Sequence, residues 1–277
     1  MRPQVRHSRE GGNPGSCLKF NCGSLRYGRD DKQKVAMKIL GICGTHKRGK
    51  QKSASEWFLR KALEAAEEKG AESEVIRLIN YNVKPCLACN RCLCGKTCPL
   101  LEDKDDDGKF IFDKMSESDA FIFSSPVYAY QQPAIVMNLL HRTRPLHEQE
   151  RSEIWGTTIT AYPKNPFKGA PVGNLAVGAA IGMEGALYYL FHYLKAMTAT
   201  SVACAGIALM DSEMKNLCMV GKRFAMEHPG FKALLDRPVP SYEENKPAIA
   251  MARAVGEQVY DVWNSEVFQT IKEVLRY

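Results

Sequence analysis

Four cysteines stand close together in the first half of the chain, with two, two and five residues between them: Cys86, Cys89, Cys92 and Cys98. Four thiolates at this spacing can surround one metal centre, and the two-residue gaps suit successive corners of a cubane iron–sulfur cluster. The longer last gap allows Cys98 to fold back onto the same centre, although Cys94 inside it is a competing fourth ligand. The spacing therefore predicts a [4Fe–4S] cluster on the four cysteines first named.

Zinc is the main alternative to an iron–sulfur cluster, since four thiolates also bind this ion. Structural zinc sites usually carry two separated pairs of cysteines, so three cysteines in close succession favour the cluster. Disulfides are disfavoured, because the N-terminus has no apolar segment of the signal-peptide type. Ten cysteines without secretion indicate a reducing compartment. We therefore expect a cytoplasmic protein.

The charge of the chain is concentrated at its N-terminus. The 277 residues carry a net charge of +7, of which residues 1–36 supply +5 and residues 37–277 only +2. A body with so little excess charge is not expected to bind nucleic acid. No apolar run reaches the length of a membrane span. We expect neither nucleic acid nor a membrane as a partner.

Residues 1–36 also lack apolar periodicity and are rich in Gly, Arg, Asn and Ser. Such a segment is not expected to pack. Met37 directly precedes the first good strand, so the segment is either a mis-assigned start or a flexible native tail. The folded domain is expected over 37–277, with a cysteine loop at 85–100 and C-terminal helices at 214–277.

Strand and helix patterns alternate along that domain. We expect strands at 38–43, 74–79, 120–125, 174–180 and 201–209, and helices at 57–69, 112–118, 133–144, 185–196 and 248–263. This alternation is typical of a parallel sheet with helices on both faces. Residues 146–172 read as an irregular insertion and the acidic run at 103–107 as a solvated turn. The pattern predicts a doubly wound five-stranded α/β fold.

A Gly- and Lys-rich loop, residues 44–55, follows the first predicted strand and opens a helix. Backbone N–H groups at a helix N-terminus form an anion site, which hydroxyl and ammonium groups strengthen. Gly44 to Lys50 fits the start of a nucleotide-binding P-loop, but Gln51 stands where that motif needs Ser or Thr. The loop therefore predicts a site for a single phosphate, as in a mononucleotide.

Two further loops follow the third and fourth predicted strands. Pro126 ends the third strand, and Tyr128 and Tyr130 can cover an aromatic ring system. Residues 178–184 are small enough for their backbone to approach a ligand edge. Open α/β sheets bind ligands beyond the carboxyl ends of their strands, so three such loops at one edge predict a common binding site.

With these motifs the chain resembles the iron–sulfur flavoproteins, within the NADPH-dependent FMN reductase-like (flavodoxin-like) superfamily, from Met37 to about Leu209. The cysteine spacing matches the family's compact motif, Ser125 to Tyr128 its S-P-V-Y, and Ile181 to Glu184 its G-G-Q-E. In the first loop, the residues that match the family's glycine, serine, arginine and threonine are Gly44, Thr45, Lys47 and Ser55. Departures from the family pattern are His46, Ala54, Asn138 and His141.

The resemblance implies a flavodoxin-like oxidoreductase with FMN and a [4Fe–4S] cluster as cofactors. It further implies ferredoxin or NAD(P)H as electron donor and a homo-oligomer, a dimer or tetramer. No catalytic residue is assigned. The residues expected to bind the flavin are Gly44, Thr45, Lys47, Ser53, Ser55, Pro126, Val127, Tyr128, Tyr130, Gly178, Gly182 and Glu184.

Two other functions remain open on the sequence. One is an FMN-dependent NAD(P)H or quinone reductase whose cysteine loop holds zinc. The other is a redox-sensing module without turnover.

Overall fold

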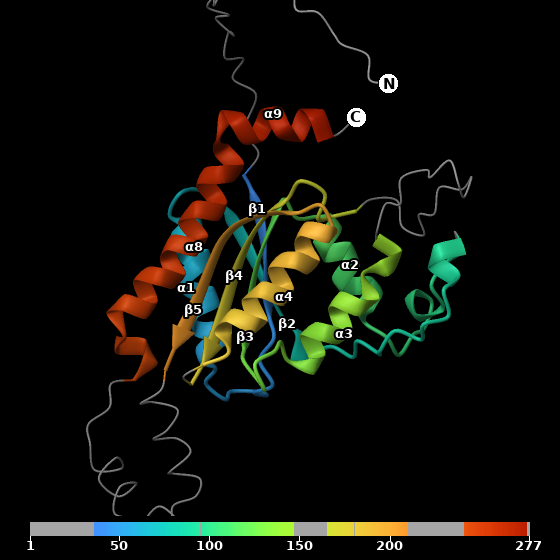
Figure 1. Ribbon diagram of the computed structural model, residues 1–277, viewed down its shortest axis with the longest axis horizontal. Helices are drawn as coiled ribbons and strands as arrows, with labels where there is room; N and C mark the ends of the chain where they lie inside the picture. Colours follow the sequence, from blue (N-terminus) through green and yellow to red (C-terminus); the bar gives the residue numbers. More distant parts are fainter. Residues whose placement is uncertain (1–35, 95, 147–164, 180, 210–240, 276–277) are drawn as a thin grey trace, which may run out of the picture. The chain divides into compact units, whose positions relative to one another are not determined.

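Five parallel strands form one sheet in the order β2-β1-β3-β4-β5 (Figure 1). The computed structural model describes residues 36–94, 96–146, 165–179, 181–209 and 241–275. The strands are β1 (Lys38–Cys43), β2 (Glu72–Arg77), β3 (Ala120–Pro126), β4 (Pro171–Gly178) and β5 (Thr200–Ala208). The predicted five-stranded parallel α/β fold is confirmed.

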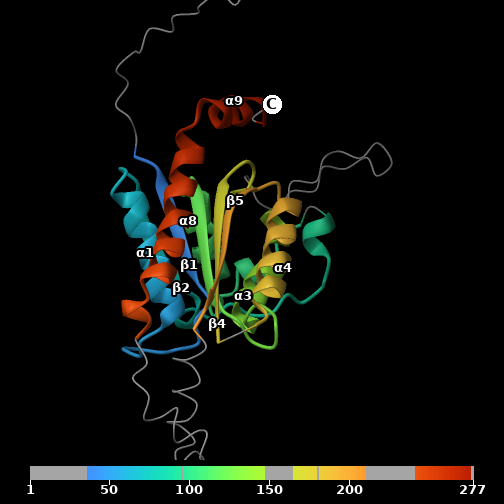
Figure 2. The same ribbon diagram turned by 60° about the vertical axis from the view of Figure 1, so that its left-hand side comes forward.

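Helices cover both faces of this sheet (Figures 1 and 2). On one face lie α1 (Ala54–Glu67) and α8 (Lys246–Asn264), and on the other α2 (Gly108–Ser116), α3 (Ala134–Arg142) and α4 (Met183–Ala196). A last helix, α9 (Glu266–Leu275), follows α8. Strands β3 and β4 are buried along almost their whole length because helices cover both of their faces, whereas edge strand β2 keeps exposed positions.

Each face has its own apolar core. The α1 and α8 side buries Phe58, Leu59 and Val259 against Ile39 and Ile122 of the sheet. The opposite side buries a second set, which includes Phe112, Phe121, Phe167, Leu139 and Leu190. Two separate cores hold the strands at fixed positions, so the loops at their carboxyl ends start from a rigid frame.

Several element boundaries differ from the prediction, and three of the shifted starts have a clear local reason. Helix α1 begins at Ala54 instead of residue 57, because the Ser53 hydroxyl accepts a hydrogen bond from Glu56 N at 3.3 Å and caps the helix. Strand β4 begins at Pro171, inside the predicted insertion, since proline is tolerated as the first residue of a strand. Helix α2 begins at Gly108, whose N–H donates to Asp106 Oδ1 at 2.8 Å.

The expectation of a solvated acidic turn at 103–107 is wrong for Asp106. Its side chain is fully buried in an ion pair with Arg142 of α3, at 2.7 Å. The predicted extension at 1–36, apart from residue 36, lies outside the described residues. So do the larger part of the insertion, 147–164, and the part of the C-terminal helical region at 214–240. No helix in the described part of the chain is long and apolar enough to cross a membrane.

Helices α1 and α8 approach each other so closely that Gly256 has no room for a side chain. A Cβ atom there would clash with the backbone carbonyl oxygen of Ala62 and lie 2.6 Å from its carbonyl carbon. Backbone atoms cannot rotate away as a side chain can. The glycine is therefore required by the distance between the two helices.

Replacing Gly256 by alanine should lower the free energy of unfolding by about 1–3 kcal/mol, as overpacking of a core does. The direction of the change in stability is informative, because replacing glycine by alanine at an open helix position raises stability by up to about 1 kcal/mol. Gln258→Ala, at an exposed position of the same helix, is the control and should change stability by less than about 0.5 kcal/mol. Denaturant unfolding measures both. A Gly256→Ala protein more stable than wild type would contradict this packing.

Candidate functional site

An open pocket lies at the carboxyl ends of β1, β3 and β4, and we call it the loop pocket. All three predicted loops contribute to its wall. The lining residues are Thr45, Lys47, Ser53, Ala54, Ser55, Pro126, Val127, Tyr128, Val177, Gly178, Ala179 and Leu209.

Most of the predicted flavin-binding residues therefore meet in one place, including Thr45, Lys47, Tyr128 and Gly178. Ala54, Val177, Ala179 and Leu209 were missed by the sequence analysis, since small and apolar side chains carry no chemical signal. Four predicted residues do not line the loop pocket, and their roles at the cofactor stay predictions: Gly44, Tyr130, Gly182 and Glu184.

The hydroxyl of Thr45 is oriented by its neighbours. Its oxygen accepts hydrogen bonds from Lys47 N at 3.2 Å and from Ser53 Oγ at 2.9 Å. A hydroxyl oxygen has two acceptor lone pairs and one proton, so the Thr45 proton remains to be donated into the loop pocket. Thr45 is only 2% exposed, which protects such a donor from competing water. This arrangement suits an anion.

The first turn of α1 adds backbone donors to the same wall. Ala54 and Ser55 both line the loop pocket, and N–H groups of a first helical turn have no partner within the helix. The turn is fixed from the sheet, because Ser124 Oγ donates to Ser55 O at 2.8 Å. Donors held in place before binding are the usual means of recognising a phosphate group.

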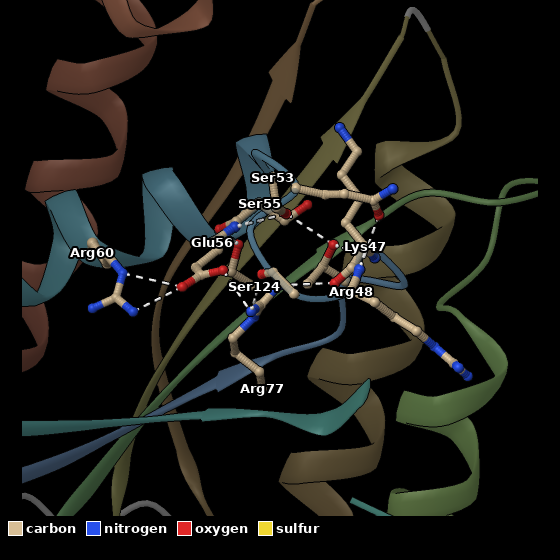
Figure 3. A network of polar contacts seen from close by, with 11 residues as sticks. Lys47, Arg48, Ser53, Ser55, Glu56, Arg60, Arg77 and Ser124 are labelled. Atoms are coloured by element: carbon tan, nitrogen blue, oxygen red, sulfur yellow. Dashed lines mark hydrogen bonds and ion pairs between the residues drawn. The ribbon is translucent and has the colours of Figure 1, made fainter. Parts of the chain in front are cut away.

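Arg77 ties the loop after β1 to the neighbouring strand β2 (Figure 3). Its Nη2 donates to Lys47 O at 2.8 Å and its Nη1 to Gly49 O at 3.1 Å. Its Nε forms an ion pair with Glu56 Oε2 at 3.0 Å, and Arg60 donates to the other oxygen of that carboxylate at 2.8 Å. Arg77 thus joins the loop to the first turn of α1. The sequence analysis missed it, because it lies on another strand.

The loop after β3 turns back on itself at Tyr128. Tyr128 N donates to Gln131 O at 3.1 Å and Gln131 N to Tyr128 O at 3.0 Å, around Ala129 and Tyr130 with φ of 47° and 65°. Positive φ at two non-glycine residues costs free energy, of order 1–3 kcal/mol each. The turn leaves the Tyr128 ring half exposed at the loop pocket, with the His46 ring 5.5 Å away.

Tyr130 instead braces the start of α4. A Cβ atom on Gly182 would lie 2.8 Å from its ring, and one on Gly185 would lie 2.5 Å from its carbonyl oxygen. Gly182 itself has φ of 90°, a left-handed conformation that favours glycine. The two glycines allow the turn after β3 to sit directly on the helix, which fixes Tyr128 beside the loop pocket.

A second hollow is bordered by the four cysteines of the predicted cluster motif, and we call it the cysteine hollow. Cys86, Cys89, Cys92 and Cys98 all line it, whereas Cys94 does not and is exposed. Cys98 also packs against the apolar core under α2 and α3. In Figure 1 the segment between β2 and α2 extends past α3, away from the sheet.

The backbone around Cys89 is bent on both sides. Ala88 and Asn90 have φ of 50° and 58°, so the residues on both sides of Cys89 adopt left-handed conformations although neither is a glycine. Such conformations persist where a loop must turn side chains toward one place. In the described part of the chain, no three His, Cys, Asp or Glu side chains stand close enough to hold a metal ion as they are. The hollow gathers the thiols without bringing them to ligand distance.

Thiol chemistry elsewhere in the loop pocket region is disfavoured. Cys43 ends β1, directly before the loop at residues 44–55, and is completely buried. Burial raises the pKa of its thiol to about 11. The thiol therefore stays protonated near neutral pH and is a poor nucleophile or metal ligand.

A comparison with known protein families covers most of the described domain. The profile of the family described as NADPH-dependent FMN reductase matches residues 37–211, the part of the chain that builds the sheet and the three loops.

The chain belongs to the NADPH-dependent FMN reductase family.

Curated relatives are iron–sulfur flavoproteins, which confirms the resemblance found in the sequence. That of Methanocaldococcus jannaschii is 34% identical over 131 residues, covering 47% of this chain and 64% of the relative. That of Methanosarcina thermophila is 35% identical over 107 residues, covering 39% and 52%. These matches thus span less than two thirds of the relatives' own length. One from Archaeoglobus fulgidus is 25% identical over 243 residues, covering 84% of this chain and 100% of the relative.

Solved structures share the fold of this family member at low sequence identity. RosB, determined with bound 8-demethyl-8-formylriboflavin-5'-phosphate, superposes with a TM-score of 0.57 at 14% identity, covering 87% of this chain and 82% of that one. A flavone reductase gives a TM-score of 0.51 at 18% identity, covering 83% and 65%. At such identities the likeness establishes the architecture alone.

If Lys47 supplies charge to the FMN phosphate, Lys47→Ala should weaken FMN binding and leave riboflavin binding nearly unchanged. The phosphate carries close to two negative charges near neutral pH, as other phosphate monoesters do. Loss of a charge-assisted hydrogen bond costs about 1.5–3 kcal/mol, and for exposed Lys47 we expect the low end, about tenfold in affinity. Tyr128→Ala should weaken both ligands alike. Flavin fluorescence titration measures the four affinities, and equal loss of both ligands with Lys47→Ala would place the phosphate elsewhere.

Arg77→Met should also weaken FMN more than riboflavin, because the carbonyl groups of Lys47 and Gly49 lose their donor and the loop loses its fixed shape. Arg60→Met is the matched control. It removes the other arginine partner of Glu56 but no bond to the loop, so FMN affinity should stay within about twofold of wild type. The same titration compares them. Equal weakening by the two variants would assign the effect to Glu56 instead of the loop carbonyls.

Proposed function

We propose that this protein is an FMN-dependent oxidoreductase that also holds a [4Fe–4S] cluster and passes electrons between the two. The observation that carries the proposal is the lining of the cysteine hollow. It contains the four cysteines of the predicted motif and leaves out Cys94, which competes with Cys98 in the sequence. Four thiols around one hollow are a donor set suited to a cubane cluster.

The loop pocket fits FMN on the side of its phosphate. The Thr45 proton, the N–H groups of the first turn of α1 and the Lys47 ammonium supply donors and positive charge at one end. Gly178 and Ala179 leave the backbone after β4 free to approach the ligand, and Tyr128 offers a ring face at the mouth. These groups orient the cofactor by its phosphate and cover its aromatic ring.

When bound, FMN supplies two-electron chemistry and the cluster one-electron transfer. The family points to a nicotinamide as the electron donor, and ferredoxin remains the alternative partner. The loop pocket and the cysteine hollow share no lining residue. In a homo-oligomer, which the resemblance implies, the cysteine hollow of one copy can face the loop pocket of another, so that electrons pass between the two copies. We place the protein in the cytoplasm, since its ten cysteines suit a reducing compartment.

Protein purified without oxygen should show a flavin absorption band together with a broad brown shoulder, and should contain about four iron atoms per chain. Serine at Cys86, Cys89, Cys92 or Cys98 should remove the iron and leave FMN bound, because the two hollows are built from different loops. Cys94→Ser is the matched control in the same loop and should keep the iron. Iron and flavin assays on each variant make the comparison.

Two outcomes would contradict the proposed function, and a third would change only the assignment of the fourth ligand. Flavin with zinc would indicate the reductase with a zinc-holding loop, and a colourless, metal-free protein a module without turnover. Loss of iron in the Cys94 variant, with iron retained in the Cys98 variant, would leave the function intact and reverse the ligand assignment.

A further inference from the structure

Arg142, the last residue of α3, borders the cysteine hollow from inside the protein. Its side chain is 1% exposed and is held at one end, where Nη1 donates to Asp106 Oδ2 at 2.7 Å and to Lys84 O at 3.1 Å. Gly108 makes room for this group, since a Cβ atom there would lie 2.9 Å from Arg142 Nη2. The guanidinium is therefore fixed in one orientation beside the cysteines.

Two nitrogen atoms of this guanidinium make no hydrogen bond within the described part of the chain. Nε and Nη2 are both buried and have no hydrogen-bond partner there. A buried donor left without an acceptor costs about 1–3 kcal/mol, and more when it is charged. Arginine stays protonated under all ordinary conditions, so the cost cannot be avoided by losing the proton. An acceptor in the adjoining hollow would remove it.

We propose that Arg142 donates hydrogen bonds from Nε and Nη2 to the sulfur atoms of the group that the four cysteines hold, and that Arg142 and Asp106 together set the reduction potential of that group. The inference rests on the proposed function, because it needs the cluster. It assigns a role to a residue outside the cysteine motif and to one acidic residue of the run that precedes α2.

The sign of each residue's effect follows from its charge. Reduction adds one electron and hence one negative charge to the group within the thiolates. A fixed cation at its edge favours the reduced form and raises the potential, and hydrogen bonds to sulfur act in the same direction. Asp106 lies directly behind the cation and opposes it. Removal of Arg142 and removal of the Asp106 charge must therefore shift the potential in opposite directions.

A merely structural ion pair predicts a different pattern. Removing either partner of a buried pair disturbs the same contact and the same loop. Both variants should then shift the reduction potential in the same direction, or both should lose the iron. The two variants Arg142→Met and Asp106→Asn thus separate the roles. Arg142→Lys adds a conservative step, because it keeps the charge and loses the forked donors.

The test is a redox titration of the anaerobically purified protein, followed by the electron paramagnetic resonance signal of the reduced cluster. We expect a more negative midpoint potential for Arg142→Met, a smaller negative shift for Arg142→Lys and a positive shift for Asp106→Asn. Arg253→Met is the control, since it breaks an ion pair with Glu68 between α1 and α8, on the opposite face of the sheet, and should leave the potential unchanged.

Shifts of the same sign for Arg142→Met and Asp106→Asn, or none in either with the cluster present, would overturn the inference. If Arg142→Met holds no iron, Arg142→Lys and Asp106→Asn carry the same comparison of signs. Loss of iron from all three variants would show a structural brace and would also overturn it. Wild-type protein without iron would instead refute the proposed function, so the two failures are distinguishable.

Discussion

The position of β1 between β2 and β3 determines where this protein can bind a ligand. The connection from β1 leads to α1 on one face of the sheet, and the connection from β3 leads to α3 on the other, so the loops part at the carboxyl ends of β1 and β3. No helix can close that edge without crossing a connection. The loop pocket is the space that this divergence leaves.

A space at the sheet edge becomes a phosphate site only if its donors are rigid. The chain holds its loops in place by tying each of them to an element other than the strand that it follows. Arg77 of β2 holds the loop after β1, Ser124 of β3 holds the start of α1, and Tyr130 seats the turn after β3 on α4. Donors fixed in this way lose little conformational entropy when a ligand binds, which is the physical content of preorganisation.

The sequence predicted the features that depend on neighbouring residues and missed those that depend on distant ones. The β1 boundaries were correct because an apolar run between polar residues fixes them locally. Thr45, Tyr128 and the four cysteines were found because motif spacing is also local. The burial of Asp106 was missed, since its partner Arg142 is 36 residues away and no periodicity links the two. Arg77 was missed for the same reason.

The pair between Arg142 and Asp106 is difficult to explain by stability. Removing two charges from water costs several kcal/mol for each ion, and well-packed apolar side chains in place of a buried pair often leave a protein equally or more stable. Neither side chain of the pair is more than 1% exposed, so the cost is close to its maximum. An apolar pair could fill the same volume between α3 and the loop before α2. It could not provide a permanent positive charge with unused N–H groups beside four thiols. The buried pair is therefore best understood as part of the cysteine hollow, although its residues lie outside the cysteine motif.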